Sequence, residues 1–154
     1  METYKLAYRV HYLLKEAFMN PLHPKMVTGT FGELLVQLRL LQYGVQAAPP
    51  LKDTGNDLIA VKGPVLKAIQ VKTTIGQVRP EHLKLRRAFH VLAVVIIKGE
   101  NQELHLNQSD IFIFDRSDIL ARRYDLSNLE QYRLCQQIVD KIFQHRKKER
   151  GRIR

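Results

Sequence analysis

The chain has 154 residues, 45% of them hydrophobic, and its 25 Lys and Arg outnumber its 15 Asp and Glu to give a net charge of +10. This length suits one domain with a buried core, and the charge favours polyanions as partners, although a basic solvated surface would give the same count. Cys135 is the only cysteine, which excludes an internal disulfide and a zinc site built on paired cysteines. With no secretory signal or membrane-length apolar run, we expect a cytoplasmic protein.

Two helices are expected in the first third of the chain. Residues 3–19 show helical periodicity and stop at Asn20-Pro21. A second helix is expected over 30–43, with Gly44 as its C-terminal cap. The apolar positions of the first helix are Leu6, Ala7, Val10, Leu13, Leu14, Ala17 and Phe18. Those of the second, expected to form its buried stripe, are Phe31, Leu34, Leu35, Leu38 and Leu41.

Strands dominate the middle of the chain. A short strand is expected over 45–48, and two longer ones over 56–61 and 66–73. The run 90–97 is apolar on both faces, which predicts a central strand in a covered sheet. Weaker strands are expected over 103–107 and 110–115.

Two further helices complete the expected elements. Residues 80–88 have proline in their first turn, which favours a short helix. The last helix is expected over 127–146, with Ser127 and Glu130 as its capping box. The order of elements predicts an α/β or mixed α+β domain over residues 1–146, with a small mixed sheet flanked by helices. A basic tail, 147–154, follows.

The two longer strands would form a hairpin with Gly63-Pro64 at its centre. In this register Ile59 faces Ala68 and Asp57 faces Gln70, while Lys72 shares their face two residues further on. This face has an apolar half and a polar end, whereas an odd-length loop would shift the register and move Asp57 to the other face. The apolar half would consist of Ile59, Val61, Leu66 and Ala68. The opposite face, with Leu58, Ile69 and Val71, should also be covered.

The polar end suits phosphodiester hydrolysis. A hard cation such as Mg²⁺ prefers oxygen ligands, which Asp57, the Gln70 amide and the Val71 carbonyl can supply. The cation would lower the pKa of a bound water and stabilise charge on the phosphate, and Lys72 could orient that water. The alternative is a surface hairpin with a solvated Asp and Lys beside a Gln.

These residues resemble the motif of the PD-(D/E)XK nuclease superfamily, which has a restriction-endonuclease-like fold. Members carry a glutamate on a helix, a metal-binding Asp on one strand, and an acidic residue, any residue and Lys on the next. The resemblance covers residues 29–74. The matching segments are Gly32-Glu33-Leu34-Leu35, Gly55-Asn56-Asp57-Leu58-Ile59-Ala60 and Gln70-Val71-Lys72-Thr73.

The sequence departs from the family pattern at two positions. Asn56 stands where proline is usual, and Gln70 replaces the acidic residue, as in a group of small intron-encoded homing endonucleases. The second change removes one negative charge from the metal site. The resemblance implies an endonuclease that hydrolyses DNA with Mg²⁺ or Mn²⁺, with Asp57, Gln70, Lys72 and Glu33 as catalytic residues. For Glu33 the alternative is a capping box with Thr30.

Several basic and polar residues outside this motif are candidates for DNA contact. They could equally be solvated: Gln77, Arg79, Lys84, Arg86, Arg87, Lys147 and Lys148. One small site cuts one strand, so double-strand cleavage would need a homo-oligomer, a dimer or tetramer. Two other functions stay open, namely a Holliday-junction-resolving or repair nuclease and a non-catalytic DNA-binding or regulatory module with the same fold.

Overall fold

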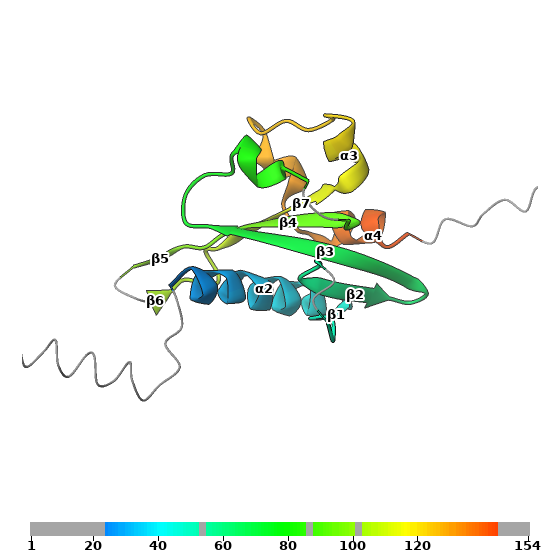
Figure 1. Cartoon of the computed structure of the whole chain (residues 1–154), viewed down its shortest axis with the longest axis horizontal. Coiled ribbons are helices and arrows are strands. Elements are labelled where there is room, and N and C mark those ends of the chain that lie inside the picture. The colour runs from blue at the N-terminus through cyan, green and yellow to red at the C-terminus, as the bar shows by residue number, and fades with distance from the viewer. Residues whose placement is uncertain (1–23, 53–54, 86–87, 101–102, 145–154) are drawn as a thin grey trace, which may run out of the picture.

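A computed structural model describes residues 24–52, 55–85, 88–100 and 103–144. A five-stranded sheet in the order β1-β2-β3-β4-β7 forms its centre (Figure 1). The strands of this sheet are β1 (Gln46–Ala48), β2 (Leu58–Lys62), β3 (Val65–Thr74), β4 (Val91–Ile96) and β7 (Asp110–Asp115). The helices are α2 (Pro24–Gln42), η1 (Pro80–Leu83), α3 (Arg116–Leu120), η2 (Leu129–Tyr132) and α4 (Gln136–Ile142). A small ribbon, β5 (Gly99–Glu100) with β6 (Glu103–Leu104), is separate from the sheet.

The sheet is mixed, as expected. Strand β3 pairs in parallel with β4, whereas the other neighbours in the sheet are antiparallel. Helices cover both sides, with α2 along one side and η1 and α3 on the other (Figure 1). The expected mixed sheet flanked by helices is therefore confirmed. No helix in the described part of the chain is long and apolar enough to cross a membrane.

Strand β4 is central, as its sequence predicts. It lies between β3 and β7, and its residues from Val91 to Val95 are almost fully buried. An uninterrupted apolar run is typical of a strand covered on both faces. This strand therefore contributes to both hydrophobic cores, one on each side of the sheet.

Helix α2 differs from its prediction in both its start and its buried side. It begins at Pro24, so Thr30 lies inside the helix and the expected capping box with Glu33 is wrong. Proline at the first helical position explains the earlier start, because its missing N–H needs no partner there. The expected end is confirmed: Gly44 has φ 72°, the left-handed conformation of a helix C-terminal glycine.

The expected buried stripe of α2 is mostly wrong. Leu35, Val36 and Leu40 face the sheet, whereas four of the five expected stripe residues are exposed. The exposed four are Phe31, Leu34, Leu38 and Leu41. Apolar residues occur on two sides of this helix, so periodicity alone could not select the side that meets the sheet.

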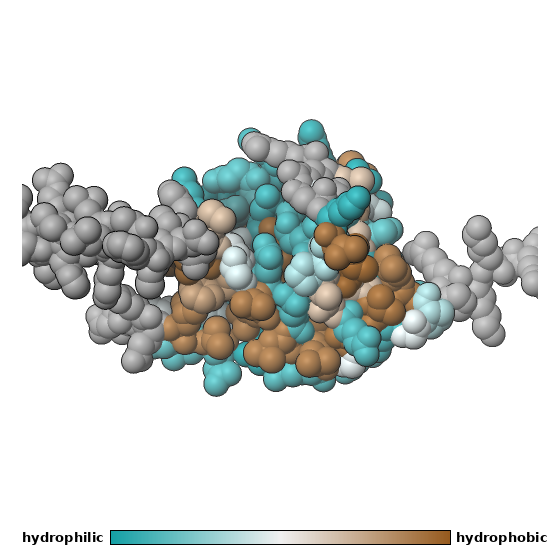
Figure 2. Space-filling view, turned by 60° about the horizontal axis from the view of Figure 1, so that its bottom comes forward, coloured by the Kyte–Doolittle hydropathy of each residue, from teal (hydrophilic) through white to brown (hydrophobic). Residues whose placement is uncertain are grey.

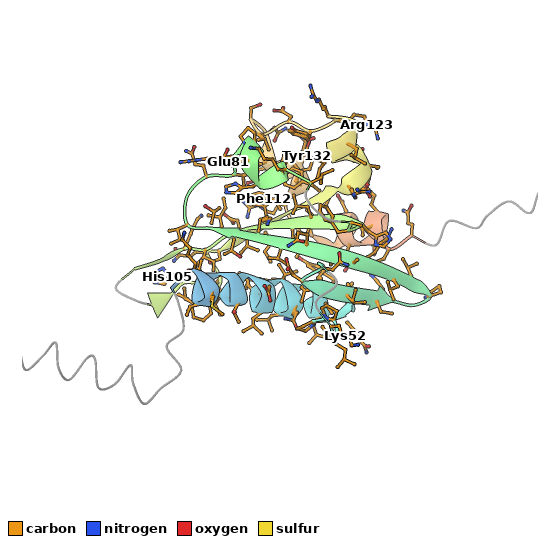
Figure 3. All side chains as sticks on the ribbon, in the orientation of Figure 1. Lys52, Glu81, His105, Phe112, Arg123 and Tyr132 are labelled. Atoms are coloured by element: carbon orange, nitrogen blue, oxygen red, sulfur yellow. The ribbon has the colours of Figure 1, made fainter. Side chains whose placement is uncertain are left out.

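The second core lies on the other side of the sheet. Phe112, Phe114 and Leu83 are buried there, and the rings of Phe114 and Tyr132 stack with centroids 4.5 Å apart. Figure 3 shows Phe112 and Tyr132 on the side that carries η1, where Glu81 points outward. The expected helix over 80–88 is only one 3₁₀ turn, Pro80–Leu83, since the chain becomes extended at Lys84.

The C-terminal region is not one helix over 127–146. It contains η2 and α4, separated at Arg133, which forms a bridge with Phe112 of β7. Leu134 N–H donates to the Ile111 carbonyl at 2.8 Å, so pairing with the strand replaces helical hydrogen bonds here. The expected capping box is also wrong: the Ser127 hydroxyl donates to Asp125 at 2.6 Å. The expected helix over 3–19 and the tail 147–154 lie outside the described residues.

Candidate active site

The predicted hairpin register is confirmed. Ile59 pairs with Ala68 and Val61 with Leu66, and the ladder ends at Leu58 and Ile69. Val61 and Leu66 are nevertheless exposed and Ile59 is half-buried, so Ala68 is the one residue of the four that is buried. The covered opposite face is confirmed, with Leu58, Ile69 and Val71 buried.

Asp57 follows directly beyond the last pair of this ladder. Its N–H donates to the Ile69 carbonyl at 3.1 Å, so the backbone is still anchored to β3. Its carboxylate oxygen Oδ2 accepts the Val71 N–H at 2.6 Å. The same oxygen accepts the amide Nε2 of Gln70. Asp57 thus binds the edge of β3 with its side chain where β2 no longer pairs.

A close contact between α2 and β3 places Glu33 near Asp57. A Cβ atom added to Gly32 would lie 2.0 Å from Oγ1 of Thr73, so only glycine allows the helix to approach the strand this closely. Burial, and next the negative charge of Asp57, raise the pKa of Glu33 above its ordinary value. Two carboxylates from distant parts of the sequence therefore approach the same end of β3.

A groove opens beside these residues. It has a volume of about 740 Å³ and lies between the first half of α2 and the end of β3. Its lining includes two of the expected catalytic residues, Glu33 and Lys72, and two expected DNA contacts, Gln77 and Arg79. Val71 also lines it, and its N–H connects the groove to Asp57.

The other expected DNA contacts are placed differently. Lys84 is exposed but does not line the groove. Arg86, Arg87, Lys147 and Lys148 lie outside the described residues. Of the expected basic cluster Lys84, Arg86 and Arg87, the structure describes Lys84 alone, so contact of this cluster with DNA stays a prediction.

Sequence reasoning missed part of the groove. Lys25 and Thr28 line it from α2, because the helix begins before the position expected for it. The signal that could have indicated this start is Pro24, a residue favoured in the first turn. His82 also lines the groove, and its Nδ1 accepts the Arg79 N–H at 2.9 Å. That acceptor role leaves the proton of a neutral His82 ring on Nε2.

The donor chemistry fits a hard cation. Among the described residues there is no group of three or more His, Cys, Asp or Glu that could hold a metal. A site here would combine the carboxylates of Asp57 and Glu33 with the neutral oxygens of Gln70 and Val71, all of them the oxygen ligands that Mg²⁺ prefers. Asn56 Oδ1 is also buried without a hydrogen-bond partner in the described chain, immediately before Asp57.

Neither a protein-family model nor a curated protein matches this sequence. Among solved structures, the chain is similar to a bacterial homing endonuclease, I-Ssp6803I. The two are 15% identical, with a TM-score of 0.48, and the similarity covers 72% of this chain and 89% of the other. A likeness of this degree assigns no function to this chain.

Proposed function

We propose that this protein is a metal-dependent nuclease that hydrolyses DNA phosphodiester bonds at the end of β3. The observation that carries the proposal is that Glu33 and Lys72 line the groove, while Asp57 lies close enough to raise the pKa of Glu33 and accepts the N–H of Val71, which also lines it. Two carboxylates that repel each other gain most from a divalent cation, and Lys25, Lys72 and Arg79 give the groove the basic lining that a phosphate backbone requires.

Each residue has a role in this scheme. Asp57 and Glu33 would hold Mg²⁺ or Mn²⁺, with the Val71 carbonyl as a third oxygen. The cation, when bound, would supply Lewis acidity that lowers the pKa of a water and offsets charge on the phosphate. Lys72 would orient the attacking water and stabilise the developing negative charge. Gln77 and Arg79 would bind the flanking phosphates.

Gln70 needs a separate argument, because it donates its amide N–H to Asp57. A half-turn of the amide would exchange its nitrogen and oxygen, so metal binding would replace this hydrogen bond with an oxygen ligand. Calorimetric titration of Mn²⁺ tests this role. Gln70→Glu should bind most tightly, because it adds a carboxylate, and Gln70→Ala and Gln70→Lys should bind progressively more weakly than the wild type. Equal affinities in all four proteins would remove Gln70 from the site.

The proposal as a whole is tested by a cleavage assay with Mg²⁺ or Mn²⁺. Supercoiled, linear and four-way-junction DNA should be compared, with Lys72→Ala as the inactive control. Metal-dependent cleavage that disappears in Lys72→Ala is the expected result. Preference for the junction would indicate a resolving or repair nuclease. Binding without cleavage in every condition would indicate a non-catalytic module and overturn the proposal.

The product formed from supercoiled DNA also shows how many copies of the protein act together. One site nicks one strand, so concerted linearisation would show that two copies act together in a homo-oligomer. Accumulation of nicked circles alone would show that a single copy acts on each DNA.

A further inference from the structure

Helix α2 is apolar on two opposite sides. The inner side, with Leu35, Val36 and Leu40, is buried against the sheet at 3%, 0% and 2% exposure. The outer side carries four large apolar residues, which we call the outer seam: Phe31, Leu34, Leu38 and Leu41, with 38%, 55%, 51% and 62% exposure. The view of Figure 2, which turns forward the side of the molecule that carries α2, shows hydrophobic residues in a broad band. A contiguous patch of this kind marks an interaction surface.

The spacing of the outer seam identifies the type of element that would cover it. Its residues follow one another at intervals of three, four and three. This is the a/d pattern of a helix that packs along another helix, whereas contact with a sheet needs no such repeat. The seam is about 15 Å long at about 1.5 Å per residue, so a helix of three to four turns would cover it.

We propose that residues 3–19 form a helix that packs antiparallel on the outer seam. Leu6, Val10, Leu13 and Ala17 have intervals of four, three and four, a matching seam along a segment that would be about 26 Å long. Only residues 20–23 separate this segment from the first residue of α2. A connection of this length is typical of two antiparallel neighbouring helices. Such a pairing places Leu13 beside Phe31, and Val10 beside Leu34.

The segment fits the outer seam better than a second copy of the chain. The short connection holds it at an effective concentration in the millimolar range, without the loss of translational freedom that dimerisation requires. A stable interface between two proteins buries about 800 Å² on each partner, and four side chains along one helix make a smaller patch than this. The segment moreover needs a place for its own seven apolar residues.

Disulfide trapping in the full chain tests the pairing. In a Cys135→Ser background, Leu13→Cys is combined with Phe31→Cys, and in a matched control with Leu41→Cys. Phe31 and Leu41 are both exposed seam positions, about 15 Å apart along the helix, whereas a disulfide needs Cα atoms within about 7 Å. Mild oxidation should crosslink the first pair within a monomer at least ten times faster than the second. Equal rates, no crosslink, or crosslinks between chains would overturn the proposal, and the last of these would indicate a second copy on the seam.

A stability measurement keeps the test decisive if a cysteine variant does not fold. Val10→Asp and Leu34→Asp should each lower Tm by roughly 5 °C, and the double variant should lower it by little more than either one, since both break the same contact. Additive losses, or no loss from Val10→Asp, would contradict the pairing. The proposal is independent of the nuclease assignment, because neither measurement requires cleavage.

Discussion

The two ends of β3 differ in the strands with which they pair. From Val65 to Ile69 the strand pairs with β2 on one edge, and from Ile69 to Thr74 with β4 on the other. At the hairpin end, the backbone of this edge forms its hydrogen bonds with β2. At the other end β2 no longer pairs, and the side chain of Asp57 accepts the Val71 N–H instead. The groove begins at this end.

Under the proposed function, this difference separates the part of β3 that belongs to the hairpin from the part that would act on DNA. While β2 pairs, its backbone occupies this edge of β3. Where β2 no longer pairs, a carboxylate takes the place of a backbone acceptor, and the neighbouring Lys72 is exposed and lines the groove. Substitutions at the far end should therefore affect activity more than stability, and substitutions at the hairpin end should affect neither or stability alone.

The largest contrast is expected between two lysines of β3. Lys72→Ala should reduce kcat by about 10²–10³-fold, because it removes charge that stabilises the transition state, while Tm changes little. Lys67→Ala, on the other face of the hairpin end, should retain wild-type cleavage. Rates from supercoiled DNA nicking and Tm from calorimetry measure both effects. Equal loss in the two variants would contradict the division of the strand.

The contact between Gly32 and Thr73 should be the next most sensitive point. Gly32→Ala places a methyl group where Thr73 already lies, so α2 must move from β3 and carry Glu33 away. We expect a loss of about 1–3 kcal/mol in the free energy of unfolding and a marked loss of cleavage. Gly29→Ala is the matched control, since its Cβ meets nothing within 4 Å. That variant should gain about 0.5–1 kcal/mol from helix propensity. Chemical denaturation of both proteins would show whether close approach, and not helix propensity, determines the result.

Glu33 provides a test through pH. Its pKa is raised above the ordinary 4.5, so the folded state binds the proton more readily than the unfolded state. Its contribution to stability is therefore favourable below pH 4.5 and is lost as the pH rises through the folded-state pKa. Without divalent metal, Glu33→Gln should have a Tm a few degrees above wild type at pH 7, and this advantage should vanish at acidic pH.

Divalent metal should reverse the order of the Tm values of the wild type and Glu33→Gln at pH 7. Added Mg²⁺ binds the folded state and should raise the Tm of the wild type more than that of Glu33→Gln, because the variant has lost one carboxylate ligand. Thermal unfolding at pH 7 with and without Mg²⁺ measures this. An identical response of both proteins would mean that Glu33 holds no cation.

The smallest effect is expected in the salt dependence of DNA binding. Arg79→Ala should lower the log–log salt slope by about 0.9 on duplex DNA, since one phosphate contact is lost. Lys84→Ala should leave the slope unchanged, because Lys84 does not line the groove. Titrations at several salt concentrations under non-cleaving conditions, with Ca²⁺ in place of Mg²⁺, compare the two. A fall in slope for Lys84→Ala alone would place the DNA outside the groove.

Much of the site could be predicted because its parts are local in sequence. The hairpin register follows from a four-residue turn and the two-residue period of strands, so the juxtaposition of Asp57 and Gln70 needed no tertiary information. The central position of β4 also followed from its composition, because only a strand covered on both faces can be apolar throughout.

Tertiary structure decided what local pattern left ambiguous. Helix α2 offers two apolar sides, and the sheet takes the one where Gly32 permits close approach, which also brings Glu33 to Asp57. The segment 127–146 has helical periodicity, yet Arg133 and Leu134 pair with β7, because an exposed strand edge offers hydrogen bonds that compete with those of a helix. The sequence by itself thus determined the hairpin register and, through its resemblance to the nuclease motif, the choice of Glu33 as a candidate. The approach of Glu33 to Asp57 and the groove depend on how distant elements pack.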